Sequence, residues 1–307
     1  MKILITGAGG FIGTALSKFL VRDNAEYEIF CLVRKKNKNF ESIQENLRII
    51  EADLQSNNFK KKLPKKIDTI IHLAGNSKTF LTSFESRKQF STNLDLTSNL
   101  LDYSEKAKPS KLIFASSVYV YSGGNQIPFV ETSQVMPSES LGASKLASEA
   151  LFKSFSFSNN IDTLSLRLFT VYGPGSRKEQ FIPQAIKKIL SKKNPVSFGN
   201  PSVKRDFIFI DDVLEAFRLA IKKDLKRCFK VINVGSGKAY SIESIVYKLK
   251  EILNAKKEVK FAKESKKDKN ADSDHLADIS SAKSYLDWSP KVGIQKGLRV
   301  TVDSIRK

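Results

Sequence analysis

The sequence predicts an α/β fold in which a doubly wound parallel sheet carries helices on both faces, next to a smaller, discontinuous C-terminal lobe. In the first half of the chain, short apolar runs alternate with longer stretches of helical periodicity. This alternation is typical of parallel strands joined by crossover helices. The rhythm changes after Tyr172, where Gly173, Pro174 and Gly175 begin an irregular region.

The expected elements of the sheet come first along the chain. Strands are expected at Lys2–Thr6, Glu28–Val33, Leu47–Glu51, Thr69–Leu73, Lys111–Ser116 and Asp162–Leu168, with helices at Phe11–Arg22, Phe84–Lys106 and Gly142–Ser156. Further along, we expect a helix at Phe181–Leu190, short strands at Phe207–Ile210 and Val231–Val234, and two capped helices. Asp211 caps the first of these, which runs to Lys222, and Ser241 caps the second, which runs to Leu253.

The first predicted strand ends in glycines that open the first helix. Gly7, Gly10 and Gly13 have the spacing GxxGxxG. The first permits a tight turn, the middle one lets the backbone approach a pyrophosphate, and the last lets helix and strand pack closely. The free N–H groups and positive dipole end of the helix then favour phosphate. We therefore predict a Rossmann-like dinucleotide site here, with Phe11 and Ile12 also at the cofactor.

This site defines the expected domain organisation. Residues 1–172 are predicted to form a dinucleotide-binding domain, whose sheet is completed by parts of 205–235. Residues 173–307 are predicted to form mainly a substrate-binding lobe.

The end of the second predicted strand bears on which dinucleotide binds. A carboxylate there would hold the ribose 2′-hydroxyl and favour NAD, but the strand ends in Arg34 and a basic cluster. An arginine fork can hold a 2′-phosphate, so NADP is favoured slightly over NAD, with a surface arginine as the alternative. Asp53, followed by Leu54 after the third strand, is either an acceptor for the adenine amino group or a turn residue.

With these features, the chain resembles an extended short-chain dehydrogenase/reductase of the NAD-dependent epimerase/dehydratase family, which modifies nucleotide sugars. The resemblance runs from Lys2 to about Leu298 and rests on many short segments in order. They are Gly7–Gly13, Ile71–Gly75, Asn93, Phe114–Ser117, Gly142–Lys145 with Glu149, Arg167–Phe169, Val171–Gly175, Arg205–Val213, Asn233–Gly237 and Ala277–Ile279.

The resemblance implies hydride transfer between a nicotinamide and a sugar carbon. In the family, the tyrosine of a YxxxK motif is the acid/base, and the lysine lowers its pKa and holds the ribose hydroxyls. A Ser or Thr on the neighbouring strand binds the reacting oxygen. Lys145 matches the lysine, Ser117 matches the Ser/Thr, and Leu73 and Ala74 are expected beside the cofactor.

The motif tyrosine is replaced by Leu141, which cannot donate or accept a proton. Three explanations stay open. Another group supplies the proton, or Lys145, Ser117 and water carry slower catalysis, or the chain binds a dinucleotide or nucleotide sugar without catalysis. The candidates for the replacement group are Glu139, Ser140, Tyr119 and Tyr121.

The resemblance also places the substrate and the partner. Arg205 matches the family's arginine for the nucleotide diphosphate, with a salt bridge to a neighbouring aspartate as the alternative. Thr170 stands at an often-Asn position, Lys269 at an arginine position, and Arg177 is a further candidate. We thus expect an epimerase, dehydratase or ketosugar reductase acting on a nucleotide-diphosphate sugar. A homodimer packed through Phe84–Lys106 and Gly142–Ser156 is expected.

Composition excludes several other classes. The net charge is +20, from 52 Lys and Arg against 32 Asp and Glu, but no aromatic residues interleave with the basic runs, so a nucleic-acid partner is not expected. Two distant cysteines and two histidines suggest neither disulfides nor a metal site. No apolar run long enough to span a membrane and no leader-like start are present, so we expect a cytoplasmic protein without membrane association.

Overall fold

The computed structural model describes residues 1–35, 46–56, 58–79, 81–121, 127–226, 228–262 and 274–306. It divides into two compact units. The first comprises Met1–Tyr121, Val135–Arg167 and Leu214–Ile232, and the second comprises Ser122–Gln134, Leu168–Val213 and Asn233–Lys307. The functional domain limits expected above, 1–172 and 173–307, stay a prediction.

A seven-stranded sheet forms the centre of the first unit, in the order β10-β6-β5-β4-β1-β2-β3. β1 pairs in parallel with β2 on one side and with β4 on the other. Ile3, Leu4 and Ile5 of β1 are fully buried because both faces of the sheet are covered. The strands are β1 (Lys2–Thr6), β2 (Glu28–Val33), β3 (Leu47–Glu51), β4 (Thr69–His72), β5 (Lys111–Ser117), β6 (Asp162–Leu168) and β10 (Phe229–Val234).

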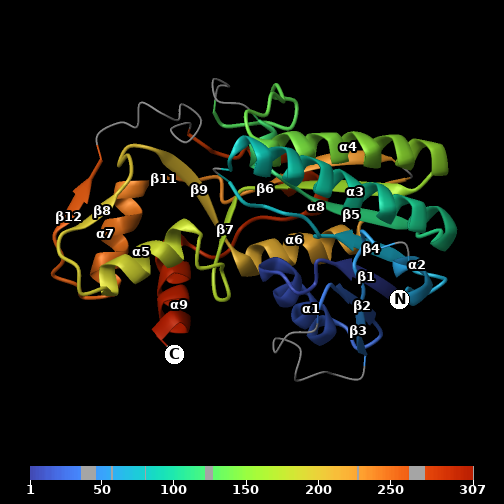
Figure 1. Cartoon of the computed structure of the whole chain (residues 1–307), viewed down its shortest axis with the longest axis horizontal. Helices are drawn as coiled ribbons and strands as arrows, with labels where there is room; N and C mark the ends of the chain where they lie inside the picture. Colours follow the sequence, from blue (N-terminus) through green and yellow to red (C-terminus); the bar gives the residue numbers. More distant parts are fainter. Residues whose placement is uncertain are drawn as a thin grey trace. The chain divides into compact units, whose positions relative to one another are not determined.

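Helices cover both faces of this sheet, and Figure 1 shows α3 and α4 on one face and α1 and α6 on the other. Their bounds are α1 (Phe11–Asp23), α2 (Phe59–Lys62), α3 (Ser83–Ala107), α4 (Ser140–Asn159) and α6 (Ile210–Lys222). The predicted Rossmann-like, doubly wound fold is therefore confirmed. The strand order reverses at β1, and ligands of such sheets bind beyond the carboxyl ends of the strands at that point. Among the described residues, no helix is both long and apolar enough to cross a membrane.

One expected cap is wrong. The sixth helix begins at Ile210, so Asp211 lies in its first turn together with Asp212 instead of preceding it. Both carboxylates still complement the positive end of the helix dipole.

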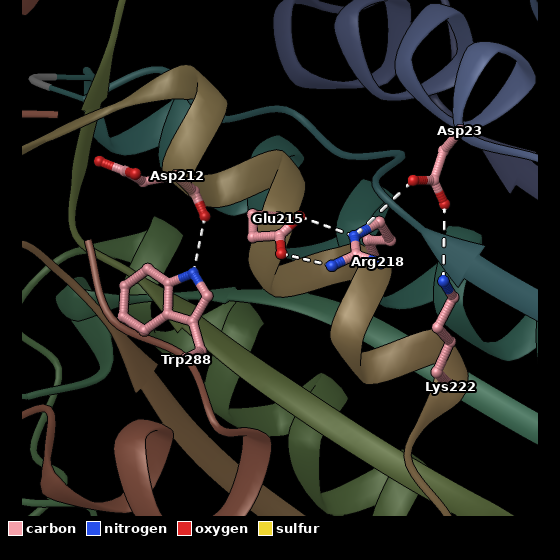
Figure 2. A network of polar contacts seen from close by, with 6 residues as sticks. All are labelled: Asp23, Asp212, Glu215, Arg218, Lys222 and Trp288. Carbon is pink, nitrogen blue, oxygen red and sulfur yellow. Dashed lines mark hydrogen bonds and ion pairs between the residues drawn. The ribbon is translucent and has the colours of Figure 1, made fainter. Parts of the chain in front are cut away.

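Ion pairs tie α1 to α6 on their shared face of the sheet (Figure 2). Arg218 binds Glu215 of the same helix, with its Nη2 2.5 Å from a carboxylate oxygen, and reaches Asp23 of α1 at 3.9 Å. Lys222 lies 3.8 Å from the same aspartate. Because these groups are partly exposed, each pair contributes at most about 1 kcal/mol, so the network orients the helices more than it stabilises them.

A buried ion pair lies on the opposite face of the sheet. Arg167 of β6 donates to Glu149 of α4 at 2.8 and 3.0 Å, and both side chains are only 5% exposed. The same guanidinium donates to the Tyr121 hydroxyl at 2.9 Å and lies over its ring. Removing one partner of a buried pair leaves an uncompensated charge, so this cluster fixes α4 against the sheet.

The second unit is built on two small sheets. One has the order β11-β9-β7 and the other pairs β12 with β8. As expected, Ser241 caps α7, and its side chain accepts the Ser244 N–H at 3.1 Å. The strand expected to begin at Phe207 begins earlier, at Lys204. The elements are β7 (Thr170–Tyr172), α5 (Phe181–Leu190), β8 (Val196–Phe198), β9 (Lys204–Phe209), β11 (Ala239–Ser241), α7 (Ile242–Ile252), β12 (Val259–Phe261), α8 (Ser280–Leu286) and α9 (Ile294–Arg306).

Two buried aspartates hold the loops of this unit. Asp206 accepts the N–H groups of Ser236, Gly237 and Ala277 at 2.6–3.2 Å. Asp212 accepts the N–H groups of 291 and 292, and its carbonyl accepts the indole N–H of Trp288 at 2.9 Å (Figure 2). Burial raises the pKa of Asp206, against four hydrogen bonds that lower it.

Candidate functional site

The glycine turn after β1 is closed so tightly that side chains do not fit. Gly7 has a φ of +67°, and a Cβ there would lie 2.6 Å from the Ala74 amide nitrogen. A Cβ on Gly13 would lie 2.3 Å from the Gly7 carbonyl oxygen, so α1 rests directly on the turn. Gly7 and Gly13 therefore have the tight-turn and close-packing roles predicted for them, while the approach of Gly10 to a pyrophosphate stays a prediction.

The N-terminus of α1 suits an anionic ligand. Its N-cap is Gly10, which offers no side-chain hydrogen bond, and the first turn has no acidic residue. The free N–H groups of that turn are thus available to a diphosphate, as in dinucleotide sites. Phe11 and Ile12 of this turn are half-buried. The residues present fit a dinucleotide; the cofactor contacts themselves stay a prediction.

The residues expected at the adenosine end lie around β2 and β3. Arg34 is exposed at the bend that follows β2. Asp53 accepts the Gln55 N–H at 3.0 Å, so one of its oxygens serves the turn. Leu54 is buried in the hydrophobic core. The turn interpretation of Asp53 has structural support, and the adenine contact stays a prediction.

The loop after β4 contacts Thr6, the residue before the glycine turn, and passes beside Lys145 of α4. Leu73 and Ala74 donate their N–H groups to the carbonyl and the side chain of Thr6 at 3.2 and 3.3 Å. Gly75 follows, and a Cβ there would lie 3.8 Å from Lys145 Nζ. This loop therefore lies between the glycine turn and the predicted catalytic lysine.

Lys145 is buried on α4 and is held by the strand that carries Ser117. Its Nζ donates to the Ala115 carbonyl at 2.6 Å and lies 4.6 Å from the centre of the Phe114 ring. Burial lowers the pKa of Lys145 to about 8, against the opposing effect of the Glu149 carboxylate. Burial, together with the charge of Lys145, lowers the pKa of His72 to about 3.

Leu141 lies one turn before Lys145 and is buried, 4% exposed. The next residue, Gly142, touches the turn at the end of β5, because a Cβ there would lie 1.9 Å from the Tyr119 carbonyl oxygen. Ser117 is half-buried in that turn and accepts the Tyr119 N–H at 3.3 Å. The structure thus brings Leu141, Ser117, Tyr119 and Lys145 together.

Two candidates for a replacement acid/base, Tyr121 and Ser140, have identified side-chain partners. The hydroxyl of Tyr121 accepts from Arg167, and Ser140 donates to the Gln89 side chain at 2.5 Å. Glu139 is the half-buried N-cap of α4. Sequence analysis missed Gln89, although its four-residue spacing from Asn93 marks a polar stripe on α3.

Apart from Ser117, the predicted substrate residues that the structure describes belong to the second unit. Thr170 of β7 pairs with Phe207 of β9, and Arg205 lies two residues earlier on β9, so both predicted side chains are on one face of this sheet. Arg177 is exposed in the turn before α5. Lys269 lies outside the described residues.

The carboxylates proposed as partners of Arg205 have other roles. Asp206 and Asp212 accept backbone N–H groups, as described above. The Arg205 Nη1 donates to the Lys204 carbonyl at 3.0 Å. Burial, together with the charge of Arg205, lowers the pKa of His275 to about 3.

The glycine turn, the buried lysine and the serine at the strand end define a dinucleotide-binding fold of the extended short-chain dehydrogenase/reductase class. The model of the NAD-dependent epimerase/dehydratase family matches residues 3–235, and the chain belongs to this family.

Similar proteins carry out more than one reaction. The chain is 30% identical to UDP-glucuronate 4-epimerase of Thermodesulfobacterium geofontis, over 98% of this chain and 94% of the relative. It is 27% identical to dTDP-D-glucose 4,6-dehydratase of Bos taurus, over 100% of this chain and 89% of the relative. The structure of UDP-glucuronic acid 4-epimerase from Bacillus cereus with UDP-glucuronic acid and NAD matches with a TM-score of 0.89 and 28% identity. The match covers 100% of this chain and 99% of the epimerase chain.

The buried lysine predicts a pH-dependent stability. The ordinary pKa of Lys145 is 10.5, and the folded chain lowers it to about 8. Between these values the unfolded chain keeps a proton that the folded chain has lost, so the free energy of unfolding rises with pH. Between about pH 7 and about pH 10, the free energy of unfolding of the wild type, measured in urea, should rise by about 1–3 kcal/mol relative to that of Lys145→Met. Parallel profiles would show that Lys145 is not desolvated.

Proposed function

We propose that this chain is an NAD(P)-dependent oxidoreductase that acts on a nucleotide-diphosphate sugar, with an atypical acid/base. The observation that carries the proposal is the placement of Lys145. The lysine is buried, its Nζ is held at the strand end that carries Ser117, and the loop from the glycine turn passes beside it. A desolvated ammonium group beside the loop from a dinucleotide turn is typical of a functional site.

The bound cofactor would accept or return a hydride at its nicotinamide ring. The chain supplies everything else. The N–H groups after Gly10 hold the diphosphate, and Lys145 holds the ribose hydroxyls while its positive charge favours deprotonation of a neighbouring acid. Ser117 donates a hydrogen bond to the reacting sugar oxygen.

Leu141 occupies the position of the motif tyrosine and cannot move a proton. We infer that Tyr119 takes over this role. Its backbone contacts both the Ser117 hydroxyl and the turn of α4 that follows Leu141, so it lies in the same corner of the site. The Tyr119 ring is half-buried. The Tyr121 hydroxyl is held by Arg167 on the neighbouring strand.

The substrate proposal rests on the second unit and on similar proteins. Thr170 and Arg205 share one face of the β7–β9 pair, where a guanidinium can bind a diphosphate through two parallel hydrogen bonds. Arg177 and Lys269 are further proposed contacts, the latter as a point charge. The Bacillus cereus epimerase binds UDP-glucuronic acid, which supports the substrate class without fixing the base or the sugar.

A homodimer through α3 and α4 is part of the same proposal. Three large apolar side chains of these helices, Phe84, Phe90 and Phe157, are exposed, and two of them are exposed by about two thirds. Exposed aromatic side chains are enriched at protein interfaces.

The acid/base proposal predicts the effect of two substitutions. Tyr119→Phe should lower turnover of a panel of nucleotide-diphosphate sugars by about 10²–10⁴-fold, because a general acid/base is typically worth that much. Lys145→Met should lower it as well, while Tyr247→Phe, on an exposed ring of α7, should leave it unchanged. Adding Leu141→Tyr to Tyr119→Phe should restore turnover.

Two outcomes would reject this mechanism. Unchanged turnover in Tyr119→Phe would exclude Tyr119 as the proton donor. No turnover by wild type, with activity appearing only in Leu141→Tyr, would favour the second candidate, a non-catalytic dinucleotide- or nucleotide-sugar-binding protein. The burial of Leu141 as an apolar packing residue is the observation that favours that candidate.

The exposed end of β2 predicts a preference for NADP. Arg34 can hold a 2′-phosphate through its fork, so Arg34→Glu should weaken NADP binding by about tenfold or more without weakening NAD binding. Arg22→Glu, with the same charge change at the exposed last turn of α1, is the matched control. Titration with both dinucleotides measures the effect. Equal losses for NAD and NADP would contradict the preference.

If NADP is preferred, a ketosugar reductase is favoured, since an epimerase or dehydratase recovers its hydride each cycle.

A further inference from the structure

A ladder of buried polar pairs joins α3 to α4. Its members recur every four residues on both helices, so each pair lies one turn below the last. The three pairs are Gln89–Ser140 at 2.5 Å, Asn93–Ser144 at 2.9 Å and Thr97–Ser148 at 3.0 Å.

The top pair of this ladder also reaches the loop after β4. The Gln89 amide nitrogen donates to the carbonyl oxygens of Asn76 and Lys78 at 3.1 and 2.8 Å. Its amide oxygen accepts from Ser140, the residue before Leu141. Gln89 is 1% exposed, so both ends of one buried amide are used, each by a different segment.

The second pair, Asn93–Ser144, also binds this loop. Asn93 accepts the Asn76 N–H at 2.7 Å and donates to the Asn76 carbonyl at 3.1 Å. The far end of the loop is therefore fixed to α3, while its near end is fixed to Thr6 beside the glycine turn. Between these points Gly75 passes Lys145.

We propose that Gln89 is a positioning residue that sets the spacing between loop 73–78 and the first turn of α4, and so orients the nicotinamide end of the bound dinucleotide. A buried amide with donors and acceptor all engaged has one favourable orientation, because any rotation leaves a buried polar group without a partner. Loop and helix are thereby held at a fixed separation. The inference rests on the proposed dinucleotide site.

The test separates the two ends of the amide in the intact purified protein. Gln89→Leu removes both contacts. Gln89→Glu keeps an acceptor for Ser140 but faces two carbonyl oxygens with a carboxylate, and Ser140→Ala removes only the helix contact. Ser148→Ala is the matched control, since it breaks a lower pair that does not touch the loop. The readouts are the Kd for NAD and the thermal unfolding midpoint.

Gln89→Leu and Gln89→Glu should each weaken NAD binding by about tenfold, and Ser140→Ala by about threefold. The double variant Gln89→Leu with Ser140→Ala should match Gln89→Leu alone, because one shared contact is lost only once. Ser148→Ala should lower the unfolding midpoint without changing the Kd.

Two results would overturn the inference. If the Gln89 variants unfold at lower temperature but bind NAD as wild type does, Gln89 is structural only, and the proposed function is untouched. If wild type itself binds neither NAD nor NADP, the dinucleotide proposal fails together with this inference.

Discussion

The burial of one ammonium group is the constraint on which the site depends. Lys145 is removed from water, and its Nζ is held by the Ala115 carbonyl and the Phe114 ring. An ammonium in that place must be compensated, and Glu149 supplies the compensating charge while itself paired to Arg167. Strand β5, strand β6 and helix α4 are thus held together by the groups that make this lysine tolerable.

The same lysine explains the arrangement around it. His72, below it, stays neutral because of its own burial and the nearby positive charge. Its Nδ1 lies 2.7 Å from the Thr6 hydroxyl oxygen. The same hydroxyl accepts the Ala74 N–H in the loop that follows β4. The glycine turn, the loop after β4 and helix α4 are therefore linked by buried polar contacts, so that a change at one point disturbs the others.

Much of this could be predicted from sequence, because it depends on local patterns. Alternating apolar runs place the strands, and glycines at fixed spacing mark a turn that admits no Cβ, as at Gly13. The contact between Gln89 and Ser140 joins residues 51 positions apart and has no local signature. The start of β9 at Lys204 and the first-turn position of Asp211 also escaped prediction, since tertiary pairing and not propensity sets such boundaries.

Leu141 shows why fold and function must be argued separately here. Leu141 is buried in the first turn of α4, where an apolar side chain suits the fold whatever the chemistry of the site. The proposed proton chemistry, by contrast, depends on the groups that lie in the corner formed by Ser117, Lys145 and the turn of Tyr119.

The most direct test is to follow the near-ultraviolet absorbance of the purified protein, loaded with oxidised dinucleotide, as nucleotide-diphosphate sugars are added. The account predicts that at least one sugar nucleotide either produces the absorbance of reduced nicotinamide or is converted to a different sugar nucleotide, and that Lys145→Met lowers this activity. Binding of a sugar nucleotide with neither an absorbance change nor a new product, across the panel and with either dinucleotide, would contradict the claim that this site transfers a hydride.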